Sequence, residues 1–297
     1  MDRFNVFYCT MLFSTQEIFF LSTTRFSPQN MTLKDRIKRR FRILTILLRL
    51  KLGWYGKTDG AAFRIGRMLV KTSSRVRVTE ALTTEFVRTN TSIPVPRIID
   101  VFKLSNKTYI VMEFIENAHS LFDVWSDMTD DQKESICAQL KGYINELRSL
   151  VAPNPGRVES IDGSPCFDGR LHGAFGPFSS VERFHAHLGH DFVRANPERF
   201  EYCQEAFKRC EGKKYRTVFS HCDLGPYNIL VRDGKIAAII DWEFAGWYPE
   251  YWEYCQLFLS NLRFPDIQEL VKSGAVTELY DDEHRVEGYL GGIFTRC

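Results

Sequence analysis

The amino-acid sequence predicts an α+β fold with two lobes, a small N-terminal lobe rich in β-strands and a larger, mainly helical C-terminal lobe. Residues 61–114 hold short β-branched and alternating segments around one helical segment, whereas the rest of the chain is dominated by amphipathic helical patterns. A chain of 297 residues can bury a core in each lobe. We expect a poorly ordered leader at 1–30, an N-terminal lobe at 31–116 and a C-terminal lobe at 117–297.

The composition is that of an ordinary soluble protein. Apolar residues make up 44% and charged residues 26%, and the net charge of +2 points to no particular partner. The eight cysteines form no Cys-x-x-Cys pair, so we expect reduced thiols in the cytosol. No apolar run approaches the ~18 residues that a membrane span needs. We therefore expect a cytoplasmic protein without a membrane span and with no nucleic-acid partner.

Residues 32–52 predict one basic amphipathic helix, with Thr32 as its cap. The segment 34–51 carries eight basic residues and one acid. The helix either packs on the small lobe with its charges in water, which we favour, or contacts an anionic membrane surface or a nucleic acid.

The small lobe is expected to contain two strands, a helix and two further strands. They are placed at 61–71 (two strands around Gly66), 76–90, 97–103 and 108–114.

From about Asn117 the pattern is mainly helical, and a strong helix with a capping box is expected from Thr129. Thr129 and Gln132 form the box, and apolar residues follow at helical spacing. Residues 152–178 are rich in glycine and proline and predict a long loop, and 180–210 predict another helical segment. That segment contains His185, His187 and His190, whose spacing does not bring all three to one helix face, so we favour a surface or core role over a metal site.

The most informative segment contains a His-x-Asp-x-x-x-x-Asn motif. Asp223 and Asn228 belong to this motif, and Asp241 follows the apolar run 236–240. Asp233 and Gly234 predict a hairpin turn that pairs 228 with 239. Asn228 and Asp241 then share the open end of the hairpin, about 7 Å apart along the strand.

This arrangement suits phosphoryl transfer. An amide oxygen and a carboxylate at Asn228 and Asp241 suit a Mg²⁺ ion that bridges phosphates, and Asp223 can accept the proton of an attacking hydroxyl. The alternative is a loop whose polar side chains only cap its own backbone. The complete pattern is much more specific than any of its residues alone.

The segment resembles the choline kinase / aminoglycoside phosphotransferase superfamily, including its large set of fungal members. The resemblance covers about residues 60–260 and rests on TSIPVP at 91–96, YIVMEFI at 109–115, HCDLGPYN at 221–228 and IDWEFAGW at 240–247. It implies a protein-kinase-like fold, ATP and Mg²⁺, Asp223 as catalytic base, and Asn228 and Asp241 as metal ligands. The glycine usual after the motif histidine is Cys222 here.

The resemblance also implies a nucleotide site in the small lobe. Lys71 would contact the α- and β-phosphates, with Glu80 as its ion-pair partner and Glu85 as second choice. The hinge that binds adenine through its backbone would be Met112, Glu113, Phe114 and Ile115. No clear glycine-rich loop precedes Lys71.

The predicted function is an ATP-dependent phosphotransferase that acts on a hydroxyl of a small molecule. The alternative is a catalytically weak pseudokinase that serves as a binding or scaffold module. A protein kinase is disfavoured because Asp241, Trp242 and Glu243 replace the Asp-Phe-Gly element.

The acceptor is expected between segments 180–210 and 244–262. The acids of the second segment favour a neutral or cationic hydroxylated molecule. Its aromatic residues either form a cage for a cation or, as we favour, pack the metal loop onto the large lobe with Glu253 capping the catalytic loop.

Overall fold

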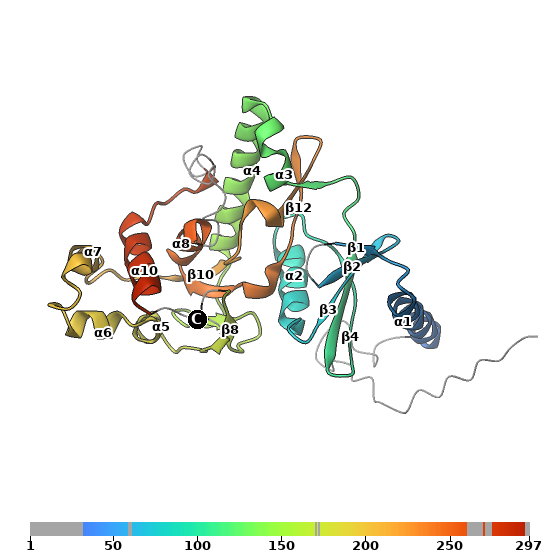
Figure 1. Cartoon of the computed structure of the whole chain (residues 1–297), viewed down its shortest axis with the longest axis horizontal. Coiled ribbons are helices and arrows are strands. Elements are labelled where there is room, and N and C mark those ends of the chain that lie inside the picture. The colour runs from blue at the N-terminus through green and yellow to red at the C-terminus, as the bar shows by residue number, and fades with distance from the viewer. Residues whose placement is uncertain are drawn as a thin grey trace, which may run out of the picture.

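The computed structural model describes residues 32–58, 61–169, 171, 173–259, 270 and 275–294, and the expected leader lies outside them. Figure 1 shows the expected two-lobed arrangement, with a small sheet and two helices on one side and a mainly helical region on the other. Within the described ranges, no helix combines the length and the apolar character that crossing a bilayer requires.

The small lobe is built on a five-stranded antiparallel sheet in the order β1-β2-β3-β5-β4. The strands are β1 (Gly56–Lys57), β2 (Ala62–Ile65), β3 (Met68–Ser73), β4 (Ile98–Leu104) and β5 (Lys107–Glu113). Ser105 and Asn106 turn β4 into β5 with φ angles of 49° and 60°, as a tight two-residue hairpin requires. The strands expected in this lobe are therefore present.

Two helices cover the opposite faces of this sheet. Helix α1 (Leu33–Leu52) packs Ile43 against Val70, and helix α2 (Val78–Asn90) packs Ala81 against Ile110. Residues 70 and 71 are consecutive in β3, so their side chains point to opposite faces. Because Val70 faces α1, Lys71 is directed to the side of α2.

Helix α1 begins and docks as expected. The Thr32 hydroxyl accepts a hydrogen bond from the backbone N–H of Asp35. Arg39, which is 5% exposed, places Nη2 2.7 Å from a carboxylate oxygen of Asp100 in β4, and Arg42 lies 2.8 Å from the other oxygen. Packing of this helix on the small lobe is confirmed.

The longest helix of the large lobe in the described ranges is α4 (Asp130–Ser149), whose capping box between Thr129 and Gln132 is present as predicted. The further helices of this lobe are α3 (Leu121–Val124), α5 (Val181–Leu188), α6 (His190–Ala195), α7 (Gln204–Arg209), α8 (Trp252–Leu259) and α10 (Asp281–Ile293). The segment expected as one helical run at 180–210 is divided, because Gly189 ends α5 in the left-handed region at φ 97°. Helix α10 was not predicted from its glycine-rich sequence.

The expected long loop at 152–178 contains three two-residue strands. They are β7 (Glu159–Ser160), β8 (Cys166–Phe167) and β9 (Ala174–Phe175), and β7 joins β10 (Thr217–Ser220) and β13 (Gly246–Pro249) in a small sheet. Gly246 permits this pairing, since a Cβ there would lie 2.8 Å from the Glu159 carbonyl oxygen. The described cysteines form no disulfide with one another.

Candidate active site

A hairpin of β11 (Ile229–Arg232) and β12 (Lys235–Ile239) carries the two residues predicted to bind metal. Asp233 and Gly234 form its turn with φ angles of 52° and 70°. Both values lie in the left-handed region that this turn needs, and aspartate and glycine are among the residues that tolerate it. The predicted turn is therefore present.

The register of the hairpin differs from the prediction by one residue. Ile239 pairs with Ile229, because a bulge places an extra residue in β12, and the backbone N–H of Ile240 donates to the Asn228 carbonyl at 2.9 Å. The prediction that 228 pairs with 239 was wrong. Asp241 consequently follows directly after the residue opposite Asn228, one position closer than expected.

Asp223 is held by Asn228 within the catalytic loop. The Asn228 side-chain N–H group donates to the Asp223 carbonyl at 2.8 Å and to its carboxylate at 3.0 Å. This leaves the Asn228 amide oxygen as the atom suited to binding a metal. Burial, and then the charge of Asp241, raises the pKa of Asp223 to about 7, although the bond from Asn228 opposes the shift. A carboxyl group with such a pKa is suited to general-base chemistry near neutral pH.

His221 connects the catalytic loop to the end of β12. Its Nδ1 accepts from the backbone N–H of Asp223 at 3.2 Å, and its Nε2 donates to the Ile240 carbonyl at 2.9 Å. Burial lowers the pKa of His221 to about 4, so the ring is neutral and both bonds fit one tautomer. His221 thus fixes Asp223 relative to Asp241, a role that the sequence analysis did not assign.

Glu253 of α8 caps the catalytic loop, as expected. Its Oε2 accepts from the backbone N–H groups of His221, at 2.5 Å, and Cys222, at 3.1 Å. Burial raises the pKa of Glu253 to about 7, and these backbone donors partly offset the increase. Cys222 has φ 67°, in the left-handed region. That conformation explains why glycine suits this position in the superfamily that the motif resembles.

Lys71 joins the small lobe to the end of the hairpin. Its Nζ lies 3.0 Å from Glu80 of α2 and 2.8 Å from Asp241. Burial lowers the pKa of Lys71, but Glu80 and Asp241 more than reverse this, so its pKa is raised and the ammonium is charged. Glu85 instead pairs with Arg88 at 2.6 Å. The predicted ion pair is present with the first-choice partner, Glu80.

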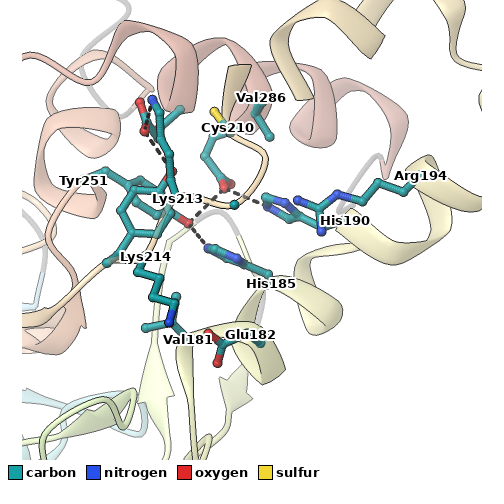
Figure 2. Close-up of a pocket in the computed structure, with 14 residues that line it drawn as sticks. Val181, Glu182, His185, His190, Arg194, Cys210, Lys213, Lys214, Tyr251 and Val286 are labelled. Carbon is teal, nitrogen blue, oxygen red and sulfur yellow. Dashed lines mark hydrogen bonds and ion pairs between the residues drawn. The ribbon is translucent and has the colours of Figure 1, made fainter. Parts of the chain in front are cut away.

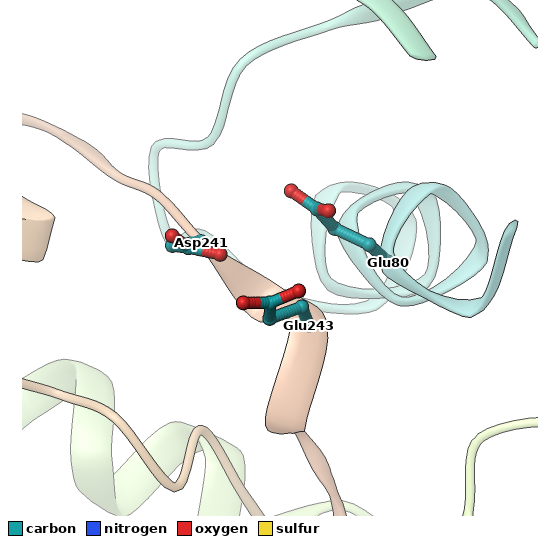
Figure 3. A group of neighbouring side chains, drawn as sticks. All are labelled: Glu80, Asp241 and Glu243. Atoms are coloured by element: carbon teal, nitrogen blue, oxygen red, sulfur yellow. The ribbon is translucent and has the colours of Figure 1, made fainter. Parts of the chain in front are cut away.

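Three carboxylates gather around this lysine, and Figure 3 shows them converging from α2 and from the turn after β12. Oxygen atoms of Glu80, Asp241 and Glu243 lie within 4.8 Å of one another. Because Glu80 and Asp241 both contact Lys71, we assign the group to holding the ammonium rather than to a separate cation site. Asp241 and the Asn228 amide oxygen remain an oxygen-donor set that fits Mg²⁺.

The expected hinge, residues 112–115, consists of the last two residues of β5 and the two residues that follow it. Two of its backbone N–H groups are used within the protein, since Glu113 donates to the Arg97 carbonyl and Phe114 to the Arg67 carbonyl, both at 3.0 Å.

The aromatic segment after Asp241 packs into the large lobe, as we favoured. The exposed fraction does not exceed 4% for any of Trp247, Tyr248, Tyr251, Trp252 and Tyr254. These rings are too buried to form a cage for a cationic substrate.

A separate cavity of about 280 Å³ lies in the large lobe between α5, α6, α10 and residues 210–215. Figure 2 shows His185 and His190 in its wall, near Tyr251. His185 bonds to the Tyr251 hydroxyl at 2.9 Å, and His190 lies 3.4 Å from Glu287. Among the described residues, no histidine belongs to a group with metal-ligand spacing. The cavity contains none of the residues that surround Asp223.

Comparison with known proteins agrees with this geometry. The profile of the phosphotransferase enzyme family, abbreviated APH, matches residues 76–289. A trifolitoxin immunity protein from Rhizobium leguminosarum bv. trifolii is 42% identical over 62 residues, which span 20% of this chain and only 24% of that relative.

Solved structures of aminoglycoside phosphotransferases share the fold. A thermostable mutant of APH(4)-Ia in complex with AMP-PNP and hygromycin B superposes with a TM-score of 0.52 at 15% identity, covering 79% of this chain and 78% of that one. The GDP and kanamycin complex of APH(2")-IIia has a TM-score of 0.51 at 13% identity, covering 80% and 81%. At these identities the likeness shows the fold alone. With the family match, it shows that the chain belongs to the phosphotransferase enzyme family and has the two-lobed protein-kinase-like fold.

Proposed function

We propose that the protein is an ATP-dependent phosphotransferase that moves the γ-phosphoryl group to a hydroxyl of a small molecule. The observation that carries the proposal is the convergence of Lys71, Asp223, Asn228 and Asp241 from both lobes. An assembled Lys71–Glu80 pair favours an active enzyme over the alternative of a catalytically weak binding module. Solved relatives of this fold in complex with AMP-PNP or GDP support a nucleotide as the donor.

The proposed reaction is an in-line displacement at the γ-phosphorus. The acceptor oxygen forms a bond to phosphorus while the bond from phosphorus to the β–γ bridging oxygen breaks, and ADP leaves with that electron pair. Asp223 takes the hydroxyl proton, because its carboxylate can accept it and its pKa is near neutral. His221 and Asn228 hold Asp223 in place.

We assign Lys71 to the α- and β-phosphates and the segment 112–115 to the adenine. On this assignment the Lys71 ammonium exchanges part of its contact with Asp241 for contacts with the phosphates. Its ion pair with Glu80 holds the lysine side chain in the same orientation. Asn228 and Asp241 would hold Mg²⁺, which neutralises charge on the transferred phosphate when it is bound.

We propose that the acceptor is a neutral or cationic hydroxylated molecule, as the sequence predicted. The reason now lies in the charges around Asp223 rather than in the acidic aromatic segment. The aromatic segment is buried, and Glu250 is engaged with Arg216 at 2.7 Å. The charges of Asp241, Glu253 and Glu243 nevertheless act on Asp223 and make its surroundings negative. Such a field disfavours an already phosphorylated acceptor. Hygromycin B and kanamycin, which occur in complexes of the solved relatives, are polyhydroxylated probes for a first screen.

Two variants test the proposal. Asp223→Asn should bind Mg²⁺–ATP with nearly unchanged affinity in calorimetry but reduce turnover by at least about 100-fold, because the base acts on the hydroxyl. Asp241→Ala should remove the Mg²⁺ dependence of nucleotide binding. ADP release would be measured with amino alcohols, aminoglycosides and sugar phosphates as acceptors.

Three results would count against the assignments. Turnover of Asp223→Asn within about tenfold of wild type would exclude Asp223 as the base. Equal Mg²⁺ dependence of binding in wild type and Asp241→Ala would exclude the metal assignment. Tight nucleotide binding without turnover on any acceptor would favour the binding module.

A further inference from the structure

Helix α1 exposes a continuous apolar stripe although its other face packs on the small lobe. The exposed residues recur every three or four positions. They are Leu33 (75% exposed), Ile37 (60%), Phe41 (73%), Leu44 (58%), Leu48 (50%) and Leu52 (47%). Exposed apolar side chains scattered singly are ordinary on a protein surface, but a row along a 20-residue helix is not.

The stripe lies on the side of α1 that faces away from the sheet. At about 100° per residue, its six members span an arc of about 100° whose centre is roughly opposite Ile43 and Ile46. Those two isoleucines are 3% and 0% exposed and form the contact with the sheet. The helix is therefore apolar on two opposite faces, and only one of them is covered by the small lobe.

Basic side chains border the stripe on both edges. On a helical projection, Lys34, Lys38 and Arg49 follow one edge, and Arg36 and Arg40 follow the other. All five are exposed, whereas Arg39 and Arg42 are directed to Asp100 beneath the helix. An apolar row between two basic rows is typical of helices that lie in a membrane interface.

The charges distinguish among the possible occupants of the stripe. A second copy of α1 would bring like charges together along both edges, which disfavours self-association. A nucleic acid would match the basic rows but leave the apolar row in water. Of these three occupants, an anionic lipid surface alone satisfies both, with acyl chains against the stripe and headgroups against the lysines and arginines. Figure 1 shows α1 at the outer edge of the small lobe, away from the large lobe.

We propose that α1 is an interfacial helix that docks the protein on an anionic membrane surface. Trp54, which is 66% exposed, follows the end of the helix at Gly53 and adds an aromatic ring of the kind enriched at membrane interfaces. Docking through α1 leaves Arg39 and Asp100 in place, so the fold of the small lobe does not change. The inference concerns localisation and rests on no assumption about catalysis.

Vesicle sedimentation of the full chain tests the proposal. We expect at least about tenfold stronger binding to vesicles of phosphatidylcholine with phosphatidylserine than to phosphatidylcholine alone, and weaker binding as salt is raised. Ile37→Ser, Phe41→Ser and Leu44→Ser together should reduce binding at least about tenfold. Arg36→Gln, Lys38→Gln and Arg40→Gln together should remove the preference for anionic lipid.

The matched control removes exposed apolar residues elsewhere. Val151→Ser and Tyr202→Ser replace side chains outside α1 that are 87% and 61% exposed. The protein with these two substitutions should bind vesicles as the wild type does. Unchanged thermal unfolding would show that every variant is folded.

Several results would overturn the proposal. One such result is that the wild-type protein does not bind anionic vesicles. Another is that the variant with the three stripe substitutions binds them as well as the wild type does. Light scattering that shows a dimer only in wild type would assign the stripe to a second copy. Binding to DNA that survives the stripe substitutions, without binding to vesicles, would assign the basic rows to nucleic acid. Vesicle binding that appears only after deletion of residues 1–31 would show that this segment, and not a membrane, occupies the stripe in the full chain.

Discussion

Replacing Cys222 by glycine and by alanine separates backbone strain from side-chain packing in the loop that carries Asp223. Cys222 has φ 67°, and the left-handed region costs an L-residue about 1–2 kcal/mol. Its side chain is 3% exposed, so both substitutions lose the same buried thiol. Alanine keeps the backbone strain, whereas glycine removes it. Glycine also raises the conformational entropy of the unfolded chain, which lowers the stability of the folded protein by about 0.4–1 kcal/mol. Cys222→Gly should therefore be more stable than Cys222→Ala by about 1 kcal/mol.

Cys137 provides the matched control, because it is equally buried but lies inside α4. It is 1% exposed and has helical neighbours on both sides. Glycine inside a helix costs about 1 kcal/mol relative to alanine, so the order should reverse and Cys137→Ala should be the more stable variant. Urea unfolding followed by tryptophan fluorescence measures all four free energies. If Cys222→Ala is as stable as Cys222→Gly, the left-handed conformation does not control the stability difference at this position, and the prediction is wrong.

Two further predictions concern the proposed chemistry. The value of kcat/KM should rise with pH through about 7 and then level off, because Asp223 must be ionised to act as a base. Burial, and then the charge of Asp241, raises the pKa of Asp223 to about 7. A rate that is constant from about pH 5.5 to about pH 8.5 would contradict this role. A double-mutant cycle with Lys71→Ala and Glu80→Gln should show more than about 0.5 kcal/mol of coupling in ATP affinity, since their charged atoms lie 3.0 Å apart. Glu85→Gln, whose partner is Arg88, should be additive with Lys71→Ala, and coupling there instead would reassign the pair.

Short-range features were predictable because neighbouring residues alone determine them. Thr129 and Gln132 cap a helix through hydrogen bonds three residues apart, and Asp233 with Gly234 can adopt the dihedral angles of a tight turn. The order of strands and helices in the small lobe followed from such signals. The identity of Asp223 and its partners came from the spacing of a motif, and their roles remain predictions.

The register of the hairpin could not be read from its turn. A bulge adds one residue to β12, and it depends on how the strand packs rather than on the turn residues. His221 was visible as part of the motif, but its bond to Ile240 joins positions 19 residues apart. The contact from Lys71 to Asp241 joins residues 170 positions apart, and only the closing of the two lobes brings them together.

The sequence by itself determined that residues 32–52 form a basic amphipathic helix, because helical periodicity and capping are local properties. Only the tertiary structure showed that the helix has two apolar faces and decided which of them is buried. The ion pair from Arg39 to Asp100 and the contacts of Ile43 and Ile46 select one face for the sheet. The opposite row then faces away from the sheet, because the small lobe has a single free sheet face to offer and α2 covers the other.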